Sequence, residues 1–165
     1  MSPQLSKNFY LDEFTRSQTA VRHGINIIVQ EGSEKFLKLQ LLCQNILQPL
    51  RDEIGPITIT SGYRPVRLNR LIGGSTNSQH CRCEAVDFVA SPLNPFDICQ
   101  TIIDLELPFD QLIHEFGRWV HVSFVSEGGR REVLTAYKQD RLIGKPPTLY
   151  QAGLHTIKSL TQEAF

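Results

Sequence analysis

The chain has 165 residues, of which 41% are hydrophobic and 21% are charged, a composition typical of an ordinary globular protein with one core. Seventeen basic residues balance seventeen acidic ones, so the formal net charge is zero. That balance argues against a nucleic-acid-binding protein, a class that normally shows a basic excess. No apolar run approaches the roughly 18 residues that cross a bilayer, so we expect no membrane insertion.

Two features of the sequence indicate the compartment in which the chain is made: its first residues and its cysteines. Residues 1–5 lack the basic and apolar regions of a signal peptide, so we expect synthesis in the cytoplasm. The cysteines do not have the C-x-x-C spacing of a structural zinc site. We therefore expect free thiols, as in a reducing compartment, at Cys43, Cys81, Cys83 and Cys99.

Two helical segments are predicted in the N-terminal part. Residues 9–24 form a cap-and-helix unit in which Ser17 caps the helix and Gly24 ends it. Residues 33–53 carry apolar side chains at intervals of three and four and form the longest predicted helix. Pro49 is expected to kink this helix or end it early. We interpret the helix as a scaffold that packs against the core.

After residue 55 the hydrophobic period changes to that of strands. The predicted strands are residues 57–60, 84–90, 111–115, 119–125 and 132–138, and the predicted helices are 65–71 and 94–105. Residues 73–77 are rich in turn-forming types and form a loop. Beyond Asp140 the signals are weak.

These elements predict an α+β fold with a small antiparallel sheet flanked by helices. We expect a single domain over residues 1–165. Its helical part covers about residues 1–55, its core covers about 56–138, and a surface tail covers about 139–165.

An acidic residue, Asp87, lies within the apolar run of residues 85–90. A buried carboxylate requires a partner such as an arginine, a metal ion or a helix N-terminus. Strand periodicity allows Asp87 and His121 to point into one cleft, with His80 supplied by the loop before the Asp87 strand. Two imidazoles and one carboxylate leave a fourth position for water, which is the pattern of catalytic zinc. On spacing alone, a salt bridge between Asp87 and Arg64 with incidental histidines has similar weight.

Three motifs occur in order: SGYR at residues 61–64, SQHCRCEAVD at 78–87 and WVH at 119–121. They resemble the zinc D-Ala-D-Ala carboxypeptidase and endolysin peptidase family of the hedgehog/DD-peptidase superfamily, whose pattern is S-G-Y-R, S-x-H-x-x-G-x-A-x-D and W-x-H. The resemblance runs from about residue 50 to residue 125. Inside the central motif, Cys83 stands where the family usually has glycine.

The resemblance implies a hedgehog/DD-peptidase-like fold and hydrolysis of an amide bond in peptidoglycan stem peptides. We expect the protein to be a monomer. The implied zinc ligands are His80, Asp87 and His121. Arg64 would stabilise the oxyanion or hold a substrate carboxylate, since its planar fork suits both tasks. Ser78 would brace the loop or bind the substrate backbone, and Trp119 would bind substrate.

The general base does not follow from these motifs. Many relatives place a glutamate three residues before the last histidine, where this chain has Arg118. We expect Glu115 to act as the base, because a carboxylate beside metal-bound water is the usual base in this chemistry. A turn through residues 116–118 would set Glu115 opposite Trp119 and diagonal to His121. A shorter turn would instead bring His114 beside His121. In a third interpretation, Glu115 is only an exposed residue at the end of a strand.

The absence of a signal peptide leads us to expect a phage-type lysis enzyme or virion hydrolase that reaches the wall or periplasm after release from the cytoplasm. Two other classes of function remain open. One is a catalytically inactive zinc-binding module that recognises the cell wall. The other is a phage structural or assembly protein, in which the metal-like residues are coincidental.

Overall fold

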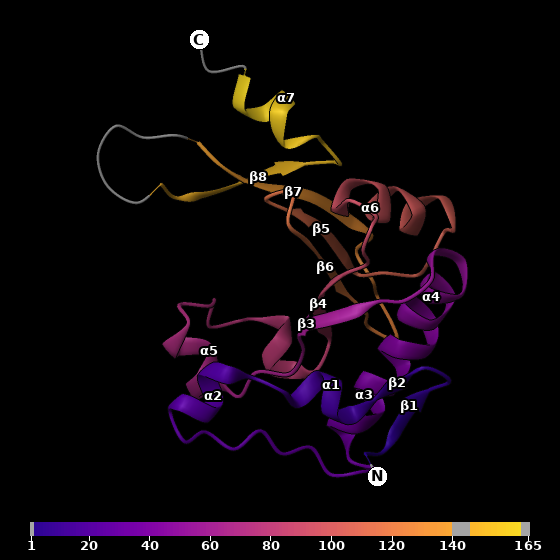
Figure 1. The fold of residues 1–165 in the computed structure, drawn as a ribbon, viewed down its shortest axis with the longest axis vertical. Coiled ribbons are helices and arrows are strands. Elements are labelled where there is room, and N and C mark those ends of the chain that lie inside the picture. The colour runs from indigo at the N-terminus through magenta and orange to yellow at the C-terminus, as the bar shows by residue number, and fades with distance from the viewer. Residues whose placement is uncertain (1, 140–145, 163–165) are drawn as a thin grey trace.

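The computed structural model describes residues 2–139 and 146–162 and has an α+β architecture. A six-stranded sheet has the order β3-β4-β6-β5-β7-β8, and a second sheet pairs β1 with β2 near the N-terminus (Figure 1). The strands are β1 (Gln4–Ser6), β2 (Phe9–Tyr10), β3 (Thr58–Ser61), β4 (Ala85–Val89), β5 (Gln111–Glu115), β6 (Trp119–Ser123), β7 (Glu132–Lys138) and β8 (Thr148–Ala152). Within the described ranges, each helix is too short or too polar to cross a bilayer.

The large sheet is mixed, which corrects the expectation of a small antiparallel sheet. β5 and β7 are parallel, and the other neighbouring pairs among the described strands are antiparallel. The cause lies before β7, where the Arg130 guanidinium binds the Asp110 carboxylate at 2.8 Å and the Glu132 N–H donates to the Asp110 carbonyl at 2.9 Å. Because Asp110 directly precedes β5, the two strands start side by side and run in the same direction.

The predicted helix after Ser17 is present, and a strand and a further short helix precede it. α1 (Leu11–Thr15) is followed by α2 (Gln18–Arg22), and the Ser17 hydroxyl accepts the Ala20 N–H at the start of α2. Gly24 lies just past the end of α2 with a φ of +58°, a left-handed conformation that glycine adopts without strain. The predicted cap and stop are both confirmed.

The long helix is interrupted but does not end at its proline. α3 (Glu34–Leu42) continues through a π-helical turn, η1 (Cys43–Leu47), into α4 (Gln48–Ile54). Pro49 has no N–H, and in a regular helix its ring would clash with the carbonyl of Asn45. The wider π turn just before Pro49 accommodates both defects, so the helix reaches Ile54.

Helices α3, α4 and α6 (Pro95–Asp104) lie along one face of the sheet (Figure 1). Alternate side chains of β4 and β6 point into the core that these helices close, and they include Val86, Phe88, Val120 and Val122. Strand geometry directs the residues between them to the opposite face. Asp87 and His121 therefore lie on the face away from these helices. Two further short elements, α5 (Val66–Leu71) and η2 (Gln79–Arg82), lie between β3 and β4 in the chain.

The expected surface tail contains regular structure. β8 pairs with β7 from Leu134 to Lys138, and α7 (Ile157–Gln162) follows it. The Thr135 hydroxyl donates to the Gly153 carbonyl at 2.9 Å and accepts the His155 N–H at 2.9 Å, which fixes the end of β8 to β7. The side chains of β8 are mostly exposed, so backbone pairing and not a hydrophobic pattern positions this strand.

Candidate active site

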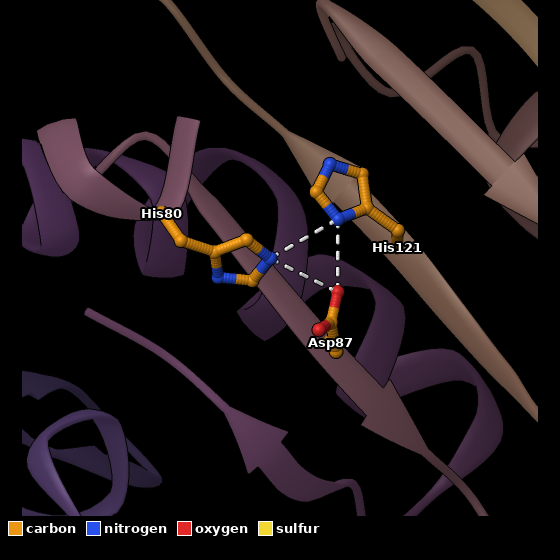
Figure 2. Close-up of side chains that lie close together, drawn as sticks. All are labelled: His80, Asp87 and His121. Carbon is orange, nitrogen blue, oxygen red and sulfur yellow. Dashed lines mark hydrogen bonds and ion pairs between the residues drawn. The ribbon is translucent and has the colours of Figure 1, made fainter. Parts of the chain in front are cut away.

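His80, Asp87 and His121 converge on one point (Figure 2). η2 supplies His80, and β4 and β6 place Asp87 directly opposite His121. Asp87 Oδ1 lies 2.8 Å from His121 Nδ1 and 3.1 Å from His80 Nε2, and the two imidazole nitrogens are 3.3 Å apart. The convergence predicted from strand periodicity is confirmed. The Asp87–Arg64 salt bridge of the alternative interpretation is also present, at 2.8 Å, and the two histidines contact the other oxygen of Asp87.

The spacing of these three atoms fits a bound metal ion. A tetrahedral ion with ligand bonds of about 2.0–2.1 Å holds its ligand atoms roughly 3.3 Å apart. The observed separations of 2.8–3.3 Å are close to that value. Two imidazole nitrogens and one carboxylate oxygen also form a donor set that suits zinc and leaves one coordination position open.

A hydrogen bond fixes the orientation of the His80 ring, and the surroundings of His80 and Asp87 set their pKa values. His80 Nδ1 donates to the Gly62 carbonyl at 2.8 Å, which leaves the Nε2 lone pair facing Asp87. Burial lowers the pKa of His80, so the neutral ring that a metal requires is favoured. Burial alone would raise the pKa of Asp87, but the two histidines outweigh it through charge and hydrogen bonds and hold that pKa well below its ordinary value.

A close backbone contact explains why the SGYR motif has glycine at position 62. A Cβ on Gly62 would lie 2.5 Å from the Phe14 carbonyl oxygen and 2.6 Å from its Cα. The Tyr63 N–H donates to that same carbonyl at 2.8 Å. Only glycine lets this backbone approach α1 so closely, and the approach sets the Gly62 carbonyl that orients His80.

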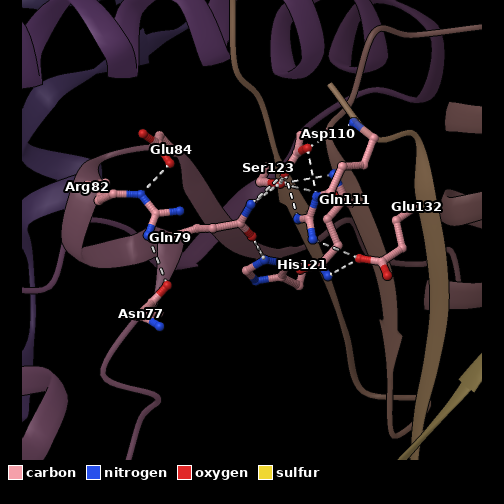
Figure 3. Close-up of polar contacts among 10 residues, drawn as sticks. Asn77, Gln79, Arg82, Glu84, Asp110, Gln111, His121, Ser123 and Glu132 are labelled. Carbon is pink, nitrogen blue, oxygen red and sulfur yellow. Dashed lines mark hydrogen bonds and ion pairs between the residues drawn. The ribbon is translucent and has the colours of Figure 1, made fainter. Parts of the chain in front are cut away.

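A second set of polar residues holds His121 (Figure 3). Gln79 Nε2 donates to Asp110 Oδ2 at 2.7 Å and to Ser123 Oγ at 2.9 Å, so the amide oxygen of Gln79 faces His121 Nε2 at 3.3 Å. His121 Nε2 therefore carries the proton, and Nδ1 is free to bind a metal. Hydrogen bonds from Arg130 hold the pKa of Asp110 well below its ordinary value, and Asp110 thus stays ionised as the anchor of this set.

Three residues of this set were not predicted from the sequence: Gln79, Asp110 and Arg130. Gln79 lies inside the second motif, directly before His80, and this position next to a predicted metal ligand could have identified it. Asp110 and Arg130 are 31 and 51 residues away from Gln79 along the chain, as their numbers show. The side chains of Gln79 and Arg130 meet Asp110 from segments far apart in the chain, a contact that chain order did not indicate.

Arg64 contacts a predicted metal ligand. Its Nη2 donates to Asp87 Oδ2 at 2.8 Å, on the oxygen that does not face the histidines. Its Nε is buried and has no hydrogen-bond partner among the residues that the structure describes. Arg64 also lines the cleft, so its remaining donors are near any ligand there. Its expected contact with an oxyanion or a substrate carboxylate stays a prediction.

Glu115 lies where the three-residue turn was expected to place it. It pairs with Trp119 across β5 and β6, and it lines the cleft together with His121. Burial, with a further contribution from the charge of Asp87, raises the pKa of Glu115 to about 7. A carboxyl group with that pKa is suited to general base catalysis near neutral pH. The interpretation of Glu115 as an exposed residue at the end of a strand is wrong.

His114 is not beside His121. It pairs with Val120, on the opposite face of the sheet, and its ring lies against Phe96 with 5.9 Å between centroids. Its Nδ1 is 2.9 Å from the His155 carbonyl. The alternative in which His114 acts as the base is therefore wrong.

The cleft that contains these residues has a volume of about 680 Å³. Ser78 and Trp119 both line it, and the Trp119 ring contacts Phe116 with 5.5 Å between centroids. Their expected roles in binding substrate stay predictions.

Cys83 is fully buried in the hydrophobic core, and burial raises the pKa of its thiol to about 12, so it does not compete for the metal.

A protein-family model described as Peptidase M15 matches residues 7–123, well over half of the chain. The matched range includes all three predicted metal ligands and Glu115, and it ends at the last residue of β6. No curated protein matches the chain.

Proposed function

The chain belongs to the peptidase M15 family, and from that premise we propose that it is a zinc peptidase that hydrolyses an amide bond in peptidoglycan stem peptides. The observation that carries this proposal is the meeting of two imidazoles and one carboxylate at tetrahedral spacing on the wall of an open cleft. The ligands would be His80, Asp87 and His121. Zinc bound there would supply Lewis-acid polarisation of the scissile carbonyl and a water of lowered pKa.

The protein side of the reaction follows from the groups that line the cleft. Glu115 takes a proton from the attacking water and delivers it to the leaving amine, a transfer for which a pKa of about 7 is well matched. Arg64 steadies the carbonyl oxygen as negative charge develops on it, with the donors that Asp87 does not occupy. Ser78 and Trp119 hold the peptide in place.

The decisive experiment is mass spectrometry of purified peptidoglycan digested by the protein, with and without a chelator. We expect shortened stem peptides, loss of cleavage with the chelator and recovery on adding zinc. The fragment masses identify the bond as the terminal D-Ala-D-Ala bond, the L-Ala-D-Glu bond or a cross-bridge. Unchanged peptidoglycan after digestion by the zinc-loaded protein would contradict the proposal.

His121→Ala tests the ligand assignment, with His23→Ala as the matched control because His23 is exposed at the end of α2. We expect His121→Ala to lose bound zinc and to lose activity by at least about 10³-fold with the fold intact. His23→Ala should retain both. Full activity in purified His121→Ala would overturn the assignment.

A second candidate is a wall-recognition module that binds zinc without catalysis. The observation in its favour is Arg118, which stands where many relatives place the catalytic glutamate. Zinc at one equivalent, with peptidoglycan binding and no cleavage, would identify this function. A third possibility, a structural protein with no metal site, predicts a metal-free protein whose melting temperature is unchanged by chelation.

A further inference from the structure

One wall of the cleft lies outside the residues that the family model matches. Thr148 and Tyr150 of β8 line the same cleft as the predicted zinc ligands. The family match ends at residue 123. The cleft is therefore composite: its metal side is built by the matched part of the chain, and its far side is built by a strand that follows it.

The sheet register places Tyr150 on the face that carries the metal ligands. Directly paired residues on adjacent strands point to the same face of a sheet. One row of such pairs consists of Trp119, Glu115, Ala136 and Tyr150. The next row, two residues along each strand, contains Asp87 and His121. Tyr150 therefore belongs to the same surface as the predicted base.

Tyr150 is both close to the base and available to a ligand. The only residue between Glu115 and Tyr150 in their row is Ala136, whose small side chain is fully buried. Burial and the charge of Glu115 both raise the pKa of the Tyr150 hydroxyl, which agrees with this proximity. Tyr150 is nevertheless 58% exposed, so a ligand in the cleft can reach its side chain.

On the basis of the proposed function, we propose that Tyr150 is a substrate-binding residue that contacts the peptide about four residues from the scissile bond. β8 is three strands away from β6 in the sheet, a distance of about 14 Å at 4.7–4.9 Å per strand. An extended peptide advances about 3.3 Å per residue, so about four residues cover that distance. The substrate class that follows is an extended peptide of at least four residues on one side of the cleaved bond, and not a dipeptide.

Tyr150→Ala tests this inference on two synthetic stem peptides that share the scissile bond. The long peptide extends four residues on the side that reaches β8, and the short one extends a single residue. We expect KM for the long peptide to rise about 5- to 10-fold, as loss of an aromatic contact predicts, with kcat within about twofold. KM for the short peptide should not change. Tyr150→Phe should restore most of the affinity, because it keeps the ring.

The matched control is Tyr137→Ala, which removes the same side chain from β7. Tyr137 pairs with Leu149 and so lies on the opposite face of the sheet. Zinc content and melting temperature are measured for every variant to detect loss of structure. An unchanged KM for the long peptide, or an equal rise for both peptides, would overturn the inference.

Binding can be measured without cleavage, which separates this inference from the proposed function. Trp119 is the single tryptophan of the chain and lines the cleft, so its fluorescence reports a bound peptide. If the wild-type protein binds the long peptide without cleaving it, the peptidase proposal fails. Tyr150→Ala then still decides the role of Tyr150: weaker binding supports it, and unchanged binding refutes it. Absence of any binding of the long peptide to the wild-type protein refutes both.

Discussion

The two walls of the cleft are built in opposite ways. The metal wall is formed by η2, β4 and β6. On this wall, His80 and His121 are only 3% and 7% exposed, and each ring is held by a further hydrogen bond. On the β8 side, Tyr150 is 58% exposed. Groups that must hold a metal in a fixed geometry need support from surrounding residues, whereas a residue that only contacts substrate does not. The comparison predicts that mutations on the metal side disturb metal binding and chemistry, and that mutations at β8 disturb substrate affinity alone.

The largest expected effect lies between the two walls, at Glu115. Glu115→Gln removes the proton acceptor, and we expect kcat to fall about 10²- to 10⁴-fold. Bound zinc should remain at one equivalent, because Glu115 is not among the converging ligands. The measurement is peptide hydrolysis together with metal analysis. Glu127→Gln, in an exposed loop, is the control. Loss of zinc from Glu115→Gln would show that this residue belongs to the metal wall instead.

Gly62→Ala tests how rigid the metal wall is. The added methyl group meets the Phe14 backbone at 2.5 Å, so α1 or β3 must move. We expect a loss of about 1–3 kcal/mol in the free energy of unfolding, or several degrees in melting temperature, together with weaker zinc binding because the carbonyl that orients His80 shifts. Gly129→Ala is the control, since the atom nearest to its added Cβ would be 3.7 Å away. A stable Gly62→Ala protein with normal zinc affinity would contradict a rigid wall.

Gln79→Ala removes the acceptor that orients His121. We expect zinc affinity to fall about 10- to 100-fold, the usual range for a residue that supports a metal-binding histidine. Competition with a chromogenic chelator measures the affinity without relying on activity. Gln100→Ala, on the exposed side of α6, is the control. If Gln79→Ala changes substrate affinity but not zinc affinity, Gln79 contacts the peptide and does not support the metal.

The smallest effect concerns stability and pH in the chelated protein. The pKa of Glu115 is raised from 4.5 to about 7 in the folded state, so the folded state binds a proton more tightly than the unfolded state does. The contribution of protonated Glu115 to the free energy of unfolding is fully present below pH 4.5 and is lost as pH rises through 7. We expect Glu115→Gln to be more stable than wild type at pH 8, on the order of 2 kcal/mol, and the gap to close at pH 4. Thermal melts at both pH values measure it. An equal gap at both values would show that Glu115 is not the cause.

The metal wall could be located from the sequence because its determinants are local. Asp87 is an acid in an apolar strand, and the alternation around His121 fixes the face on which the ring lies. Two turns after Glu115 were considered, and the register with Trp119 identifies the one through residues 116–118. These features follow from strand period and turn geometry, which a single segment of sequence contains.

The second wall was missed because nothing local marks it. The β8 side chains Thr148, Tyr150 and Gln151 are exposed, so no buried face imposes a period of two on the sequence. The parallel pairing of β7 depends on the Asp110–Arg130 contact, which joins residues 20 positions apart. Contacts of this kind are set by the tertiary fold, and chain order alone favoured a hairpin.

Cys83 shows how the chain tolerates its departure from the motif. Its backbone is left-handed, with a φ of +60°, which destabilises a residue with a side chain by roughly 1–2 kcal/mol relative to glycine. The same side chain is fully buried in the core, where a small apolar group contributes a similar amount. The two contributions nearly cancel. Glycine and cysteine are thus close to interchangeable at this position, and a substitution next to the segment that carries His80 can be almost neutral.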